Sequence, residues 1–297
     1  MARDGYAQTA DGLRLYYRAV GSGGSIVLVP NGFHMLDAFE PLARARTIVF
    51  YDVRNRGLSD ATTDDTQRAR GIHHDVDDVD VMRVHLGADR VDLVGHSYVG
   101  VTAALYAMRF PAHTRRVVQI GPMAPGAPRE YPPHLTNQDG TLAATFAAIR
   151  DLENERAHLD PVAFCRKFWS LLGVIYVVNP ADANRVVWSR CELPNERAGM
   201  KYWMGSILPS IQALALTDDD VARATAPVLT IHGRQDRSSP YGAGRDWATL
   251  LPNARLLTID NAGHVPWIEA PDKTLGAVDT FLDGDWPDGA EQRTADS

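Results

Sequence analysis

The chain has 297 residues, 45% of them hydrophobic, and a formal net charge of −7 at pH 7. This length and apolar content are enough for a substantial buried core. The negative charge and the lack of a basic run argue against nucleic acid or an anionic membrane as a partner. No apolar run is long enough to cross a bilayer, and residues 1–10 are too polar for a signal peptide. We therefore expect a cytoplasmic protein whose partner is a small-molecule substrate, with a homo-oligomer left open.

The two cysteines, Cys165 and Cys191, do not have the spacing of a metal site. We expect them to be buried, reduced thiols, as is usual in the cytosol. The sequence indicates no metal and no cofactor.

The first predicted element is a hairpin, because Asp11-Gly12 separates two alternating stretches. Strands and helices then alternate along much of the chain, which is typical of a parallel sheet with helices on its faces. Buried strands are predicted at 26–29, 47–51, 91–94, 116–120, from 227 onward and at 254–260. Helices are predicted at 36–45, 75–86, 101–110, 242–251 and 267–282.

This alternation stops between 122 and 216, where the sequence predicts helical segments broken by prolines. We therefore assign 1–121 and 217–284 to a sheet-containing core and 122–216 to a helical insertion. Residues 285–297 are polar and are expected to form a disordered tail. Most aromatic residues of the insertion are expected to form its own core.

A tight turn joins the strand at 91–94 to the helix at 101–110, and it contains Gly95, Ser97 and Gly100. Such a turn lifts the serine hydroxyl above the end of the sheet. The free N–H groups and the positive dipole end of the new helix lie beside that hydroxyl, where they would stabilise an oxyanion. The alternative is an ordinary serine at a strand-to-helix turn, since Gly-x-Ser fragments are common.

Gly95-His96-Ser97-Tyr98 resembles the nucleophile elbow, Gly-x-Ser-x-Gly, of the α/β-hydrolase superfamily. Val99 stands at the last position of the motif, and the glycine follows one residue later. The resemblance covers the chain from the hairpin to the last helix, apart from the insertion. It implies an α/β-hydrolase fold: a mostly parallel central sheet with helices on both faces and a helical cap, which is the insertion at 122–216.

The resemblance also implies an oxyanion hole. In this superfamily one N–H comes from the loop after the strand at 26–29, which here begins Asn31-Gly32 where His-Gly is common. We carry this donor role onto the N–H of Phe33, with the N–H of Tyr98 as its partner. His34 is expected to be a surface residue.

A second loop, Asp52 to Ser59, resembles the Asp-x-Arg-Gly-x-Gly-x-Ser segment of many α/β-hydrolases, prolyl iminopeptidases among them. Asn55 replaces the first glycine of that pattern. The implied role is structural, with Asp52 paired to Arg54 in a loop packed beneath the elbow.

A serine hydroxyl is a poor nucleophile without a base, and histidine suits that task near neutral pH. Asp236 follows the strand that begins near 227, and His264 follows the last strand. The order Ser97, Asp236, His264 is that of the α/β-hydrolase triad, and each residue comes off the carboxyl end of a predicted strand. Asp260 is a rival acid, but its closeness to His264 in sequence favours a role in the turn.

The implied reaction is acyl transfer to Ser97 followed by hydrolysis, and our first hypothesis is a carboxylic ester or lactone of a small or medium apolar molecule. Asn31, Glu192, Trp188 and Trp267 are predicted to contact the substrate. One alternative is a prolyl-iminopeptidase-like aminopeptidase, in which cap acids such as Glu192 and Glu196 would hold an ammonium group. Surface acids are the more ordinary interpretation of these two glutamates. A further alternative is a non-hydrolytic ligand receptor, cyclase or cofactor-free haloperoxidase on the same fold.

Overall fold

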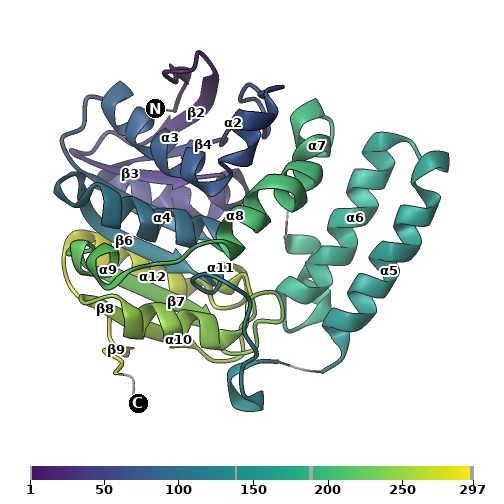
Figure 1. Ribbon diagram of the computed structural model, residues 1–297. Coiled ribbons are helices and arrows are strands. Elements are labelled where there is room, and N and C mark those ends of the chain that lie inside the picture. Colours follow the sequence, from purple (N-terminus) through teal and green to yellow (C-terminus); the bar gives the residue numbers. More distant parts are fainter. Residues whose placement is uncertain (1, 138, 187–189, 295–297) are drawn as a thin grey trace.

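The computed structural model describes residues 2–137, 139–186 and 190–294, and it contains a nine-stranded sheet (Figure 1). The strand order is β1-β2-β4-β3-β5-β6-β7-β8-β9, with β3 to β8 parallel and the strands at both edges antiparallel. The strands are β1 (Arg3–Gln8), β2 (Arg14–Val20), β3 (Ser25–Pro30), β4 (Arg46–Tyr51), β5 (Val91–His96), β6 (Thr114–Ile120), β7 (Val228–Gly233), β8 (Ala254–Ile259) and β9 (Ala290–Glu291). The predicted α/β fold with a mostly parallel sheet is confirmed.

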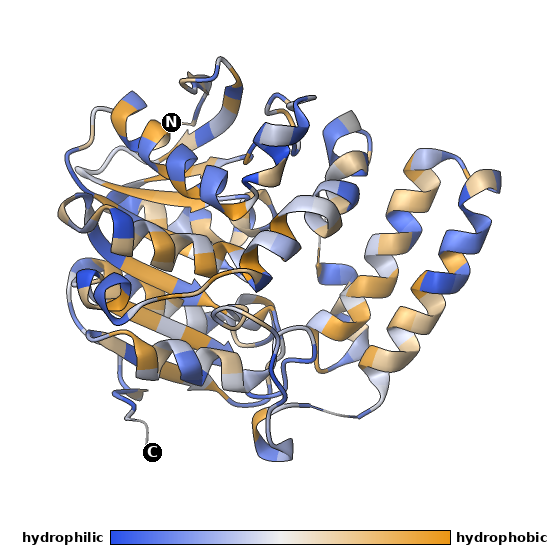
Figure 2. Cartoon of the chain, in the orientation of Figure 1, coloured by the Kyte–Doolittle hydropathy of each residue, from blue (hydrophilic) through white to orange (hydrophobic). Residues whose placement is uncertain are grey.

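Side chains on the central strands alternate between two hydrophobic cores, one on each face of the sheet. On β4, Val49 and Tyr51 join one core, whereas Ile48 and Phe50 join the other. These strands are buried on both faces, which is why they appear in the sequence as continuous apolar runs. Orange, hydrophobic strands accordingly lie inside the sheet-containing core domain in Figure 2.

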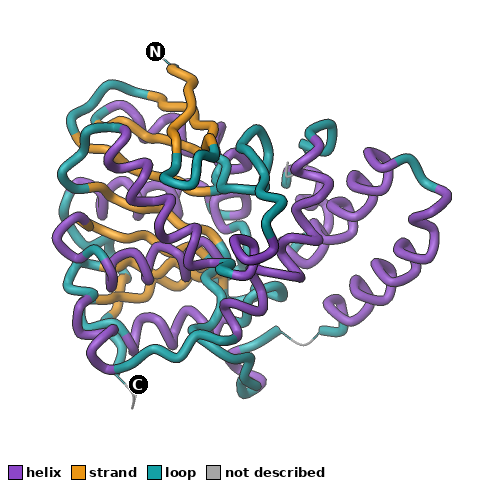
Figure 3. Tube along the Cα trace, turned by 45° about the horizontal axis from the view of Figure 1, so that its top comes forward, coloured by secondary structure: helices purple, strands orange, loops and turns teal. Residues whose placement is uncertain are grey.

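Helices cover both faces of this sheet (Figure 3). Side chains of α3 (Ile72–His85), α4 (Tyr98–Arg109) and α10 (Tyr241–Leu250) contribute to one core. The other core receives α1 (Leu36–Phe39) and α12 (Pro271–Asp283). Three short helices complete the core domain: α2 (Asp65–Ala69), α9 (Asp218–Arg223) and α11 (Pro266–Glu269). None of the helices among the described residues is long and apolar enough to cross a membrane.

Two predicted helices are shorter than expected, and proline explains both. The segment at 36–45 is one α-helical turn followed by a 3-10 turn (Glu40–Arg44) that contains Pro41. The closing helix is broken at Ala270, directly before Pro271, into α11 and α12. A proline ring removes a backbone donor and disfavours helical geometry in the residue before it.

The prediction of a disordered tail is wrong for part of residues 285–294, which are ordered against the core. β9 pairs with β8, and the Trp286 ring lies 5.0 Å from that of Phe281. The apolar Trp286 therefore fastens this segment to the core.

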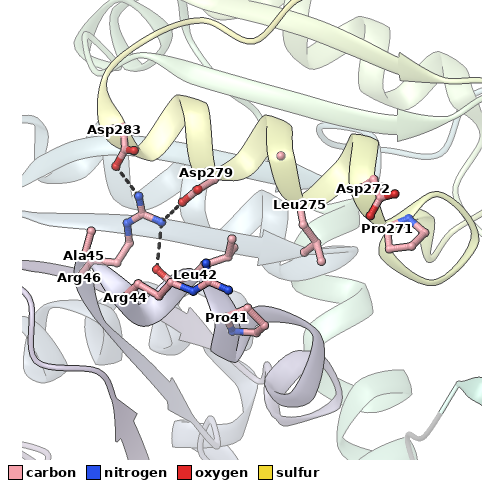
Figure 4. Close-up of a pocket in the computed structure, with 11 residues that line it drawn as sticks. Pro41, Leu42, Arg44, Ala45, Arg46, Pro271, Asp272, Leu275, Asp279 and Asp283 are labelled. Carbon is pink, nitrogen blue, oxygen red and sulfur yellow. Dashed lines mark hydrogen bonds and ion pairs between the residues drawn. The ribbon is translucent and has the colours of Figure 1, made fainter.

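Arg46, the first residue of β4, also fastens α12 to the core. Its guanidinium is buried and bonds Asp279, Asp283 and the main-chain oxygen of Leu42 (Figure 4). A surface hollow of about 360 Å³ lies beside this contact, between the 3-10 turn and α12. It lies at the amino end of β4, whereas the predicted catalytic residues follow the carboxyl ends of their strands.

The cap consists of helices and loops throughout its described residues. Its helices are α5 (Thr141–Glu155), α6 (Pro161–Tyr176), α7 (Pro194–Tyr202) and α8 (Leu208–Gln212), with a π-helical turn (Trp203–Ile207) before α8. α5 and α6 pack side by side away from the sheet (Figure 1). They enclose a small core that includes Leu152, Phe164 and Phe168, as the sequence predicted for the cap aromatics. In contrast, Ile207 and Ile211 belong to the main core.

The expectation of two reduced thiols is wrong, because Cys165 and Cys191 form a disulfide. Cys165 lies on α6 and Cys191 precedes α7, and their Cα atoms are 5.8 Å apart. The packing of one cap segment against another brings them together, and no local sequence pattern encodes that packing. The cysteines therefore no longer support the expectation of a cytoplasmic location.

Candidate active site

Ser97 occupies a strained turn between β5 and α4. Its φ and ψ are 57° and −126°, a conformation that residues with a side chain rarely adopt. Its N–H donates to the carbonyl of Ile120 at 2.9 Å, which ties the turn to β6. A Cβ at Gly95 would collide with the main chain of Val99, so this position requires glycine. Val99 itself is buried, and it is accommodated within the first turn of α4.

His264 and Asp236 form a buried pair. His264 Nδ1 lies 2.7 Å from Asp236 Oδ2, and the other carboxylate oxygen accepts the N–H groups of Ser238 and Ser239, each at 2.8 Å. Burial opposes the charged form of Asp236, but the charge of His264 and hydrogen bonds from His232 and His264 outweigh it and lower the pKa of Asp236 to about 2. Asp236 is therefore an ionised partner that fixes a proton on Nδ1 of His264.

The rival acid, Asp260, is exposed and pairs with Arg234. Its carboxylate is directed to Arg234, whereas that of Asp236 contacts His264, so the geometry favours Asp236 among the described acids.

Gly121 lies between the elbow and this pair. It directly follows β6 and has a φ of +52°, and a Cβ there would lie 3.0 Å from His264 Nδ1 and 3.2 Å from Asp236 Oδ2. The residue before it, Ile120, holds the N–H of Ser97. Ser97, Asp236 and His264 thus follow β5, β7 and β8, and they are grouped around the end of β6. The sequence marked Gly121 only as the end of a strand.

The two predicted oxyanion donors lie at the starts of helical turns. Tyr98 is the first residue of α4, so its N–H has no acceptor four residues earlier in that helix. Phe33 opens a 3-10 turn (Phe33–Met35) after Asn31, whose φ is +49°. Asparagine tolerates this left-handed conformation, and Gly32 is required because a Cβ would collide with Val29. Asn31 donates its N–H to Tyr51 at 2.7 Å, so its backbone role is to shape the turn.

His34 is not the surface residue that we expected. It is half-buried, and its Nε2 lies 3.3 Å from Nδ1 of His96. Trp267, predicted to contact substrate, is only 3% exposed and packs edge-on against His96, with ring centroids 4.7 Å apart. Both residues support the site from within the core.

The loop resembling Asp-x-Arg-Gly-x-Gly-x-Ser makes different ion pairs from those predicted. Arg54 pairs with Asp78 and Asp11, not with Asp52. Asp52 instead accepts the guanidinium of Arg190 from the cap, at 2.7 Å and 2.9 Å, and the N–H of Leu58. The loop can turn so tightly because Asn55 and Gly57 both have positive φ, and a Cβ at Gly57 would collide with the Asp52 carboxylate.

Two cap contacts close over this loop. Arg190 stacks on the predicted donor residue, with its guanidinium carbon 4.7 Å from the Phe33 ring centroid. Glu196 is buried and pairs with Arg56 at 2.5 Å, which corrects our expectation of a surface acid. Glu192 is exposed and pairs with Arg166, so the structure does not bring it toward Ser97 or His264.

The sequence analysis missed one cap residue that touches His264. The Tyr176 ring stacks on the His264 ring with centroids 5.0 Å apart, and the Tyr176 carbonyl accepts the His264 N–H at 2.8 Å. Tyr176 ends α6, and only its place among the cap aromatics was visible in the sequence. Trp188, another predicted substrate contact, lies outside the described residues.

The fold agrees with comparisons to known proteins. A family model described as the alpha/beta hydrolase fold matches residues 24–271, so the chain belongs to the α/β-hydrolase family. It is 28% identical to the 2-hydroxy-6-oxo-2,4-heptadienoate hydrolase of Pseudomonas putida F1, covering 92% of this chain and 94% of that protein. It is 26% identical to a proline iminopeptidase of Saccharolobus solfataricus, covering 92% of this chain and 90% of that one.

Solved structures share the fold at lower identity. A meta-cleavage product hydrolase of Pseudomonas fluorescens IP01 matches with a TM-score of 0.67 at 20% identity, over 94% of this chain and 98% of that one. An esterase of Exiguobacterium antarcticum matches with a TM-score of 0.70 at 17% identity, over 95% of this chain and 100% of that one. The chain is therefore an α/β-hydrolase, and several of its relatives are named as hydrolases or esterases.

Proposed function

We propose that the chain is a serine hydrolase in which Ser97 is the nucleophile, His264 the general base and Asp236 the acid that orients it. The observation that carries the proposal is the buried His264–Asp236 pair at 2.7 Å, placed around the end of β6 together with the strained turn of Ser97. Backbone strain at a serine and the burial of an oriented imidazole both reduce stability, and features of this kind cluster at active sites.

The proton positions follow from this pair. Asp236 accepts the proton on Nδ1, which leaves Nε2 of His264 with a lone pair for the Ser97 hydroxyl proton. Oγ then attacks the acyl carbon, and the N–H groups of Phe33 and Tyr98 stabilise the oxyanion. The imidazolium returns its proton to the leaving group, which departs and leaves an acyl-enzyme. Water, deprotonated by His264, attacks that ester and releases the acid and free Ser97.

An ester or lactone of a small or medium apolar molecule is the substrate class that we propose. An aminopeptidase needs an available carboxylate for the substrate ammonium. Among the described cap acids considered for that role, Glu196 is already neutralised by Arg56 and Glu192 is paired on the surface. The name of one curated relative, proline iminopeptidase, makes the peptidase worth testing directly.

Turnover of p-nitrophenyl acetate and of proline β-naphthylamide by the wild type and by Ser97→Ala tests the proposal. We expect ester turnover that is lost in Ser97→Ala and covalent labelling of Ser97 by a fluorophosphonate. Activity on the naphthylamide alone would favour the peptidase over the esterase. Full ester turnover by Ser97→Ala would overturn the serine mechanism, and absence of both turnover and labelling would favour a non-hydrolytic role.

A further inference from the structure

Two histidines outside the proposed triad form a chain of contacts that ends on His264. His96 is the last residue of β5 and is 4% exposed, and its Nε2 lies 3.0 Å from the main-chain oxygen of His264. On its other side, Nδ1 lies 3.3 Å from Nε2 of His34. His34 directly follows Phe33, so the chain connects the elbow, the base loop and the predicted oxyanion loop.

The acceptor at the end of the chain fixes where the protons lie. A carbonyl oxygen can only accept, so Nε2 of His96 must carry a proton. In a neutral His96 the other nitrogen, Nδ1, is then an acceptor, and Nε2 of His34 must be the donor to it. The protons thus point in one direction, from His34 through His96 to the main chain of His264.

Both histidines are held in the neutral form that this order requires. Burial, followed by the charges of Arg56 and His264, lowers the pKa of His34 to about 3. Burial, followed by the charges of His264 and His34, lowers the pKa of His96 well below its usual value. Neither histidine therefore carries a positive charge beside His264, which becomes an imidazolium during the proposed reaction.

The main chain of His264 is held from two sides. Its N–H donates to the cap residue Tyr176 at 2.8 Å, and its carbonyl accepts from His96. The His96 ring also packs on the His264 ring, with centroids 4.5 Å apart and an interplanar angle of 56°. Removing the His96 contact would leave the core side of this residue without its hydrogen bond, so the imidazole could shift relative to Ser97.

We propose that His96, with His34 behind it, is a positioning residue that holds the imidazole of His264 at the correct distance from Ser97. The inference rests on the proposed function. A misplacement of about 1 Å in a catalytic group costs about 100-fold in rate, so a positioning contact of this kind should be visible in kcat.

The matched variants are His96→Met and His96→Gln, since glutamine offers a donor at about the reach of Nε2 and methionine has similar bulk without one. With p-nitrophenyl acetate, we expect His96→Met to lower kcat by about 10- to 100-fold with KM nearly unchanged. We expect His96→Gln to recover most of that loss. His158→Met, at an exposed cap histidine, is the control for the substitution itself and should match the wild type.

His34→Met tests the second step of the chain. We expect a kcat loss smaller than that of His96→Met, and a double variant no slower than His96→Met alone, because His34 acts through His96. Additive losses would overturn the role given to His34. Wild-type kcat in a folded His96→Met, or equal losses in the Met and Gln variants at equal Tm, would overturn the role of His96. Wild type and Ser97→Ala, assayed in parallel, separate this failure from failure of the proposed function. Turnover that Ser97→Ala retains, or that the wild type lacks, would be a failure of the proposed function.

Discussion

The core side and the cap side of the candidate site are held by different kinds of interaction. On the core side, positive-φ turns and main-chain hydrogen bonds place Ser97, Asp236 and His264. On the cap side, side-chain bonds link segment 190–196 to loop 52–59: Arg190 to Asp52, Glu196 to Arg56, and Asn195 to the Ser59 carbonyl at 2.6 Å. In the proposed mechanism the core therefore positions the reacting groups, and we expect the cap contacts to influence how substrate is enclosed.

The largest expected effect is on the core side, from Asp236→Asn. The amide preserves the shape, but it donates where the carboxylate accepted, so the Nδ1–H tautomer of His264 loses its support. We expect kcat for p-nitrophenyl acetate to fall by about 10⁴-fold with little change in KM, as measured by steady-state kinetics. Asp260→Asn, at an exposed acid that directly follows β8 in the loop of His264, is the control and should retain wild-type kcat. A loss in both variants would contradict the assignment of Asp236.

On the cap side, Glu196→Gln should be the most damaging change. It leaves the Arg56 guanidinium largely buried without a counter-charge, and breaking a buried pair in this way costs about 3–5 kcal/mol. We expect the free energy of unfolding in urea to fall by that order, and KM to rise. Glu192→Gln removes an exposed pair and should change neither quantity. Equal effects of the two variants would show that burial does not distinguish these cap pairs.

The disulfide gives a third way to separate the two sides. It joins residues 26 positions apart in sequence, which corresponds to about 3.5 kcal/mol of chain entropy. Cys191 directly follows Arg190, so a Cys165→Ser/Cys191→Ser variant should loosen the guanidinium that stacks on Phe33. We expect lower stability in urea and a higher KM, with kcat changed less. Dithiothreitol should lower the stability and raise the KM of the wild type in the same way, and it should leave the double variant unaffected. A wild type whose stability and KM do not respond to the reductant would contradict the role of the disulfide.

The sequence predicted the core side much better than the cap side, and the reason is physical. Ser97 lies in a turn that its own neighbours define, and Asp236 and His264 each follow a recognisable buried strand. The cap contacts instead join residues 136 to 140 positions apart, such as Arg190 with Asp52. Such pairs depend on how helices pack in three dimensions, which leaves no periodicity to detect.

The histidine chain was missed for a related reason. His96 occupies the variable position of the elbow motif, and His34 is a single polar residue in a turn. Neither position predicts a hydrogen-bond partner from the local sequence, since His96 contacts the carbonyl of a residue 168 positions later. His96 is buried because β5 lies between β3 and β6, and the sequence does not state that strand order.

The smallest expected effect on activity concerns Gly121, where the structure leaves little room for a side chain beside His264. Gly121→Ala adds a Cβ about 3.0 Å from His264 Nδ1 at a φ of +52°, whereas Gly140→Ala adds one at +82° with nothing within 4 Å. Gly140→Ala therefore measures the conformational cost alone, about 1 kcal/mol in the free energy of unfolding. Gly121→Ala should cost more than this and also lower kcat about 10-fold, because the added methyl displaces the imidazole. If both variants lose the same stability and keep wild-type kcat, the end of β6 does not constrain the position of His264.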